Sequence, residues 1–311
     1  MKNTLFIGNG LFRLKTEQEK QIGGCGRDKS WGDLLSDIAF GARDVFNSDN
    51  PMPIEFDRLL NVIGQNRQAL KGYYSVEGRD DFWKQILSIK DTSLGLKRYL
   101  AGWFNERGYC APDILGMALR PNFDYVLTSN YDLRIENYLI GQGGDAGVCS
   151  NHVWHVHGSI DDPENIVLGQ GDYIESAHSL TETVTSYVGD KGHIGPADWP
   201  LLFLISNIHI LGFGFGSEEL DLWHLLHLRS IWLSDHLEVE RNRIKYYHFY
   251  PSGGQSLRVS DPVRYGLFRD YGVEVVHVPV VNGDYEDAYR TAIDLISEDM
   301  NGRSINVMMG R

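Results

Sequence analysis

Cysteine is scarce in this sequence of 311 residues, which contains only Cys25, Cys110 and Cys149. Because their number is odd and they lie far apart, they can form neither a disulfide framework nor a Cys-x-x-Cys metal knuckle. Long apolar runs are absent too: none approaches the roughly 18–20 residues of a membrane span, and residues 5–7 are too few for a secretory signal. We therefore expect a cytoplasmic protein without a membrane segment.

Basic residues are also under-represented. The chain has 29 Lys and Arg against 42 Asp and Glu, which gives a formal net charge of −13. This balance argues against direct binding of nucleic acid, because proteins that bind it need a basic face to displace counterions. A nucleotide ligand stays open, since backbone N–H groups at a helix N-terminus can hold phosphates.

Short apolar runs alternate with helical patterns over much of the chain. The runs that predict strands are 2–7, 125–127, 153–156, 245–250 and 273–280, with further apolar runs at 201–205 and 208–213. The helical patterns cover 132–140, about 176–188, 218–232 (amphipathic), 262–271 and 285–300. This alternation predicts an α/β fold with a Rossmann-like, doubly wound and mostly parallel sheet.

Residues 28 to about 120 carry helical patterns and no strand pattern. The periodicity begins at Trp31, and further helices are expected at 56–63 and 82–104. We therefore predict a single domain over residues 1–311, in which a helical insertion at about 28–120 interrupts a Rossmann-like core formed by 1–27 and 121–311.

Two polar motifs follow apolar runs. Thr128-Ser129-Asn130-Tyr131-Asp132 comes after the run 123–127, and His155-Val156-His157-Gly158-Ser159 ends the stretch that begins at Val153. If both runs are parallel strands, an amide, a carboxylate and an imidazole meet at the carboxyl edge of the sheet, where such sheets bind ligands. Read alone, Asn130 is first of all a turn former, and Asp132 can be simply an acid in the first turn of a helix.

Glycine clusters follow two other apolar runs. Gly8-Asn9-Gly10 is half of a dinucleotide fingerprint, and without a third glycine it is equally compatible with a tight turn. Gly212-Phe213-Gly214-Phe215-Gly216 allows close approach of a ligand, with Ser217 as the expected N-cap of a helix that begins at Glu218. Phosphates are then expected near residues 8–10 and at this helix start. Arg13 is either a phosphate contact or a solvated side chain.

His155 and His157 are expected on one strand face, because strand side chains alternate. Such a pair could bind a metal, completed by His152 or by His224 and His227, as in a metal hydrolase. No acidic residue joins them at a telling spacing, so we expect no metal.

Taken in order, these pieces resemble the Sir2 (sirtuin-like) superfamily. Sirtuins carry a Thr-Gln-Asn-x-Asp motif, which residues 128–132 match at every specified position except Ser129. Their catalytic histidine directly precedes a glycine, as His157 precedes Gly158. Their Gly-Thr-Ser segment, which holds the adenosine side of NAD, is similar to residues 214–217.

Two departures narrow the resemblance. The four-cysteine zinc module of protein-deacylating sirtuins is absent, and so is their Pro-Asp-Phe-Arg segment. With a helical insertion in addition, the chain looks like the Sir2-like effectors of bacterial anti-phage defence, which hydrolyse NAD. Some of those work beside a HerA-type ATPase, an Argonaute-type protein or a nucleotide-derived signal.

The resemblance implies an NAD+ glycohydrolase that takes NAD as substrate and needs no metal. The numerous tryptophans and tyrosines (7 and 16) suit subunit interfaces, so we expect a homo-oligomer. The resemblance places catalysis on Asn130, Asp132 and His157. It implies NAD contacts from Gly8, Asn9, Gly10, Arg13, Ser129, Gly212, Gly214, Phe215, Gly216 and Ser217. The alternatives are a nucleotide-binding sensor or scaffold without turnover, a zinc-free deacylase and a metal hydrolase.

Overall fold

The computed structural model describes residues 1–14, 51–65, 91–106, 111–144, 152–189, 198–235, 241–252 and 262–302. The three cysteines, the helix expected from Trp31 and the first part of the helix expected at 82–104 lie outside these residues. Within them, no helix combines the length and the hydrophobicity that crossing a membrane requires.

Six strands form one parallel sheet. They are β1 (Lys2–Ile7), β2 (Tyr125–Thr128), β3 (Val153–His155), β4 (Ser206–Leu211), β5 (Ile244–Pro251) and β6 (Val273–Val280). Their order is β3-β2-β1-β4-β5-β6, and every neighbouring pair is parallel. This is the strand order of Rossmann folds, which reverses direction between β1 and β4. The predicted α/β, doubly wound class is therefore confirmed.

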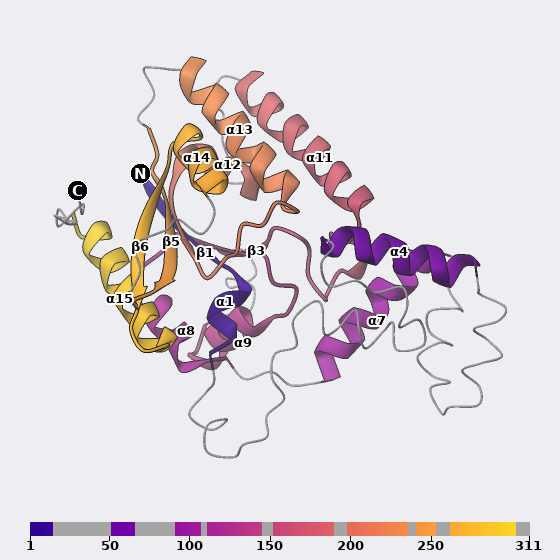
Figure 1. Ribbon diagram of the computed structural model, residues 1–311, viewed down its shortest axis with the longest axis horizontal. Coiled ribbons are helices and arrows are strands. Elements are labelled where there is room, and N and C mark those ends of the chain that lie inside the picture. Colours follow the sequence, from indigo (N-terminus) through magenta and orange to yellow (C-terminus); the bar gives the residue numbers. More distant parts are fainter. Residues whose placement is uncertain are drawn as a thin grey trace.

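Helices cover both faces of the sheet (Figure 1). One face carries α11 (Gln170–Gly189), α12 (Trp199–Ile205), α13 (Leu220–Asp235) and α14 (Pro262–Asp270). The other carries α1 (Asn9–Phe12), α8 (Asp113–Ala118), α9 (Arg134–Gly141) and α15 (Tyr285–Met300). Because strand side chains alternate, Phe6 packs into the core of the first face while Leu5 and Ile7 pack into that of the second.

Two further helices, α4 (Met52–Gln65) and α7 (Thr92–Glu106), lie to one side of the sheet beside α11 (Figure 1). They share a third core with Tyr131, Ile160, Ile166 and Leu168, to which Phe56 of α4 and Leu96 of α7 contribute. An ion pair of 2.9 Å between Lys97 Nζ and Asp172 Oδ1 ties α7 to the start of α11. These helices therefore sit directly on the loops that follow β2 and β3.

Two elements differ from the expectation. Residues 199–205, an apolar run in the sequence, form helix α12. The run shows no helical period because the four consecutive side chains from Leu201 to Leu204 are all buried. Helix α13 is not amphipathic. Leu222, Leu225 and Leu226 are wholly buried because α13 is covered by the sheet on one side and by α11 and α12 on others.

Candidate functional site

A cavity of about 390 Å³ lies at the carboxyl edge of the sheet. Its lining includes Asn9, Gly10 and Arg13 after β1, residues 129–132 after β2, His157 after β3, residues 212–214 after β4, and residues 246–249 of β5. The cavity therefore spans the point between β1 and β4 where the strand order reverses, the usual ligand site of open α/β sheets. Its volume lies within the range of small-molecule pockets.

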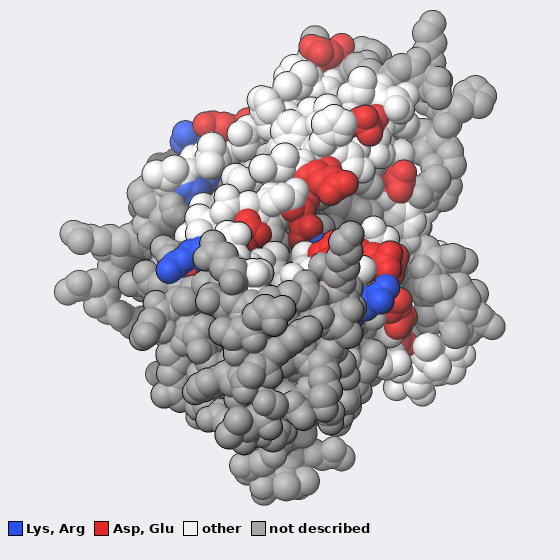
Figure 2. Space-filling view, turned by 90° about the vertical axis from the view of Figure 1, so that its right-hand side faces the viewer, with Lys and Arg blue, Asp and Glu red and all other residues white. Residues whose placement is uncertain are grey.

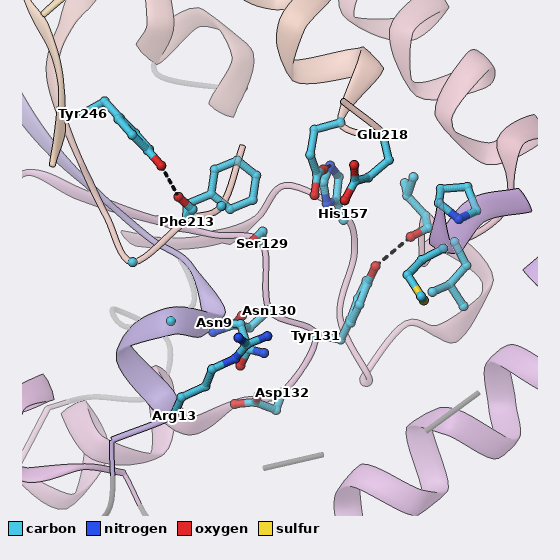
Figure 3. A pocket seen from close by; sticks show the side chains of 18 of the residues that line it. Asn9, Arg13, Ser129, Asn130, Tyr131, Asp132, His157, Phe213, Glu218 and Tyr246 are labelled. Carbon is cyan, nitrogen blue, oxygen red and sulfur yellow. Dashed lines mark hydrogen bonds and ion pairs between the residues drawn. The ribbon is translucent and has the colours of Figure 1, made fainter. Parts of the chain in front are cut away.

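Most of the residues singled out in the sequence meet here. Those that line the cavity are Asn9, Gly10, Arg13, Ser129, Asn130, Asp132, His157, Gly212 and Gly214. Figure 3 shows Asn9, Arg13, Asn130 and Asp132 on one side and His157 with Glu218 on the other. The predicted contacts Gly8, Phe215, Gly216 and Ser217 are not among the lining residues.

The glycines after β1 and β4 bring two loops into backbone contact. Gly8 N donates to Leu211 O at 2.9 Å, and Gly10 N donates to Gly212 O at 2.7 Å. A Cβ at Gly8 would collide with the Cα of Phe213, and Gly212 has a φ of +70°. Close packing of the two loops thus requires glycine at positions 8 and 212 whether or not a ligand is bound.

Asn130 is held in place by its backbone. Thr128 Oγ1 donates to Ile7 O at 2.9 Å and accepts from Asn130 N at 3.1 Å, which fixes the turn after β2. The side chain is buried, and its Nδ2 has no hydrogen-bond partner among the described residues. Because a buried amide without a partner costs free energy, this donor is well placed to meet a polar atom of a ligand.

Asp132 is braced by its neighbour Arg134. Arg134 Nε donates to Asp132 Oδ1 at 2.8 Å, Nη2 donates to Oδ2 at 2.9 Å, and the backbone N of Arg134 donates to Oδ1 at 3.1 Å. The guanidinium also lies 4.2 Å from the ring centre of Phe12. Asp132 precedes α9 instead of standing in its first turn, and most of its accepting capacity is used within the protein.

His155 and His157 do not form a pair, so the expectation that both lie on one face of a strand is wrong. Strand β3 ends at His155, and His157 lies in the turn that follows. The ring of His155 contacts Asn130 O at 2.5 Å through Nδ1 and Glu136 Oε1 at 2.7 Å through Nε2. Burial lowers the pKa of His155, but the hydrogen bonds and the charge of Glu136 outweigh it and raise the pKa. His155 therefore supports the turn that carries Asn130.

Replacing Glu136 with glutamine is expected to lower the free energy of unfolding by about 1.5–3 kcal/mol at pH 6, the value of a hydrogen bond to a charged group. The raised pKa of His155 contributes stability that is complete below about pH 6.5, the unfolded value, and is lost as pH rises through the folded value. The difference in free energy of unfolding between wild type and Glu136→Gln should therefore become smaller toward pH 9. Urea unfolding at both pH values measures it, and a constant gap would contradict this role.

His157 faces a group of carboxylates from the start of α13. Its Nε2 lies 3.4 Å from Asp221 Oδ1, 3.3 Å from Asp221 Oδ2 and 3.5 Å from Glu219 Oε2. Burial lowers the pKa of His157, but the charges of Asp221 and Glu219 and the hydrogen bond to Asp221 raise it above the ordinary value. Burial raises the pKa of Glu219 to about 7. The imidazole thus sits in a setting that favours its protonated form.

The same three residues form the only group of potential metal ligands found in the described part of the chain, with ligand atoms within 4.8 Å of one another. Asp221 is already engaged, however: Oδ1 accepts from Leu222 N at 2.8 Å, and Oδ2 accepts from Ser176 Oγ at 2.8 Å. These two donors fix the orientation of the carboxylate beside His157 and leave a further lone pair on each oxygen.

The segment after Gly214 differs from the expectation. Helix α13 begins at Leu220, so Ser217 is not its N-cap and lies in the preceding turn. Phe215 is fully buried with a φ of +48°, packed against Trp223 and Phe268. The cavity is lined at this point by Glu218 and Glu219 instead. Because these side chains are acidic, this helix start is an unfavourable place for phosphates.

Negative charge also marks the outer surface. On the face shown in Figure 2, acidic side chains gather around a hollow, and Lys and Arg side chains cover a smaller area. Among the lining residues, Arg13 is an exposed cation. The lining therefore has a basic residue after β1 and carboxylates before α13.

Sequence reasoning missed several lining residues. Besides Glu218 and Glu219, they include Met52, Pro53 and Phe56 of α4, Tyr131, Tyr173 of α11, residues 246–249 and Tyr289. Tyr131 donates to Val167 O at 2.7 Å, and Tyr246 donates to Phe213 O at 3.0 Å (Figure 3). In a sequence, aromatic residues at such positions also indicate a hydrophobic core, so their pattern alone does not predict a ligand site.

The chain matches no protein-family model and no curated protein.

Proposed function

We propose that this protein is an NAD+ hydrolase that cleaves NAD+ to nicotinamide and ADP-ribose. One observation carries the proposal: the unpartnered buried amide of Asn130 and the imidazole of His157 line a single cavity at the strand-order reversal of a Rossmann-like sheet. Such sheets bind dinucleotides at this position. The order of motifs, which resembles that of Sir2-like proteins, supports the choice of NAD+.

The chemistry required is modest. Cleavage of the bond between nicotinamide and ribose develops oxocarbenium character at the ribose, as in glycoside hydrolysis. The nicotinamide of NAD+ is cationic and leaves as a neutral molecule, so no general acid is needed. Asp221 places negative charge beside His157, which favours a cationic transition state. Glu219, whose pKa burial raises to about 7, adds to this charge when it is ionised.

We assign distinct tasks to the polar residues. His157 accepts a proton from a ribose hydroxyl or from the attacking water, whose oxygen forms the new bond to the ribose carbon. Asn130 Nδ2 donates to the ribose or to that water. Asp132, held by Arg134, keeps part of its capacity to accept from the nicotinamide carboxamide.

The charge distribution favours one orientation of the dinucleotide. Phosphates lie beside Asn9, Gly10 and the cation of Arg13, and the nicotinamide ribose lies between Asn130 and His157. The acidic residues before α13 disfavour the second phosphate position expected from the sequence. The aromatic residues 246–249 and Tyr289 offer flat surfaces for a planar base.

The biological setting rests on the sequence alone. We propose a cytoplasmic effector that depletes NAD+ in anti-phage defence and works as a homo-oligomer. A HerA-type ATPase or an Argonaute-type protein is the proposed partner class. Pull-down of the full chain from its host, followed by mass spectrometry, tests the partner.

The direct test is incubation of the purified protein with NAD+ and chromatography of the products. Equal amounts of nicotinamide and ADP-ribose are expected. Recovery of intact NAD+ bound to the protein would favour the alternative function, a nucleotide-binding sensor or scaffold without turnover. If the protein requires a trigger, the assay is repeated with lysate from phage-infected host cells.

Asn130→Ala is expected to slow nicotinamide release by about tenfold to a hundredfold, which corresponds to about 1.5–3 kcal/mol for a hydrogen bond to a charged or charge-developing group. The matched control is Asn137→Ala, which removes the same side chain from an exposed position of α9. Equal rates for the two variants would remove Asn130 from the mechanism.

A further inference from the structure

Asp221 is a fully buried acid in an otherwise largely apolar helix. A buried carboxylate is tolerated only where partners compensate its lost hydration. Leu222 N and Ser176 Oγ each donate to one of its oxygens at 2.8 Å, and both oxygens lie 3.3–3.4 Å from His157 Nε2. The carboxylate is thus fixed from two sides and turned toward the imidazole.

We propose that Asp221 is a positioning residue that orients the imidazole of His157 and fixes where its proton resides. This inference rests on the proposed NAD+ hydrolase function. Because Nε2 faces the carboxylate, Nε2 carries the proton of the neutral ring, and Nδ1 becomes the atom that accepts a proton from substrate or water. Once that proton arrives, the charge of Asp221 stabilises the imidazolium.

Ser176 belongs to the same chain of contacts. Its hydroxyl donates to Asp221 at 2.8 Å, so the order is hydroxyl, carboxylate, imidazole. In serine hydrolases the hydroxyl faces the imidazole instead, which activates it as a nucleophile. We therefore assign Ser176 to the support of Asp221.

The ionisable groups that surround His157 come from three elements. Asp221, Glu219 and Glu218 come from α13 and the turn before it, Tyr173 from α11, and Tyr131 from the loop after β2. Burial raises the pKa of both tyrosines, so they stay neutral. Burial also raises the pKa of Glu219 to about 7, whereas the charge of His157 outweighs burial and lowers that of Asp221. Asp221 is therefore the constant anion beside His157.

The test is an NMR titration of the His157 ring in the ligand-free protein, assigned by comparison with His157→Gln. In wild type the pKa should lie above 6.5, and in Asp221→Asn it should fall by about 1–3 units, the usual effect of an opposite charge at this distance. Asp270→Asn, the same change on an exposed side chain, should leave it unchanged. A wild-type value below 6.5, or no shift in Asp221→Asn, would overturn the proposal.

Kinetics supply the second readout. In Asp221→Asn, the rate of nicotinamide release should fall by about tenfold to a hundredfold, which is a part of what a positioned base contributes. The acid limb of the pH–rate profile should move to lower pH together with the pKa of His157. Ser176→Ala keeps the charge and should move the limb less. Because the NMR shift needs no turnover, an inactive protein that shows it would contradict the hydrolase function and leave the pairing intact. An active protein without the shift would contradict the pairing alone.

Discussion

His157→Ala is expected to slow nicotinamide release by about 10²–10⁴-fold, the usual contribution of a positioned general base. This corresponds to about 3–5 kcal/mol of barrier. The loss should appear in kcat, because the imidazole acts on the proton that moves in the transition state and contributes little to ground-state binding. Initial rates of nicotinamide formation over a range of NAD+ concentrations measure it.

A control is needed because His157 also neutralises buried carboxylates. Removing one partner of such a cluster lowers stability, so the melting temperature of each variant is measured beside its rate. His157→Gln retains a side-chain N–H for Asp221 and separates the proton transfer from the fold. His178→Ala, at a largely exposed position of α11, should keep the wild-type rate. Full activity in both His157 variants would exclude the imidazole from catalysis.

The elements at the C-terminal end of the described chain were the most predictable. The bounds of β6 and α15 coincide with the predicted ranges. Gly272 and Gly283 have φ values of +68° and +77°, so each marks a turn that other residues adopt at a cost. The side chain of Asp284 then accepts from Asp287 N at 3.0 Å and begins α15. Local signals of this kind need no knowledge of tertiary packing.

The part of the site that follows β2 and β3 was predictable for a related reason. Asn130 and His157 stand directly after short apolar runs, and parallel strands bring their carboxyl ends to one edge. Asp221 was not predictable in this way, because it lies 64 residues from His157 and meets it only through the placement of α13. Its one local signal is an acid among apolar residues of a buried helix.

The glycine-rich segment after β4 was predicted as a ligand contact, but a glycine motif alone does not identify a binding site. Glycines permit close approach, but a sequence does not tell whether a ligand or another part of the chain approaches. Here the neighbours are the loop after β1, which packs against Gly212, and the Glu218 side chain, which packs against Gly216. Phe215, placed among the NAD contacts by the resemblance, turns inward to an aromatic core.

Phe215→Ala is therefore expected to act on stability, with a loss of about 3–5 kcal/mol, the usual cost of removing a buried phenylalanine. The ring is fully buried and lies 4.6 Å from Trp223 and 5.1 Å from Phe268, measured between ring centres. The melting temperature should fall by on the order of 10 °C. Thermal unfolding without ligand measures the effect.

The comparison that separates the two roles of Phe215 is the affinity for NAD+ of the folded variant. A direct contact with NAD+ would weaken binding strongly with little change in melting temperature. Core packing predicts the opposite, a large fall in melting temperature with a smaller change in affinity. The matched control is Tyr285→Ala, which removes an aromatic ring that is 47% exposed and should change stability little. A Phe215→Ala protein that melts like this control and binds NAD+ much more weakly would place Phe215 in the ligand site, because only a ring outside the core can be removed at so little cost to stability.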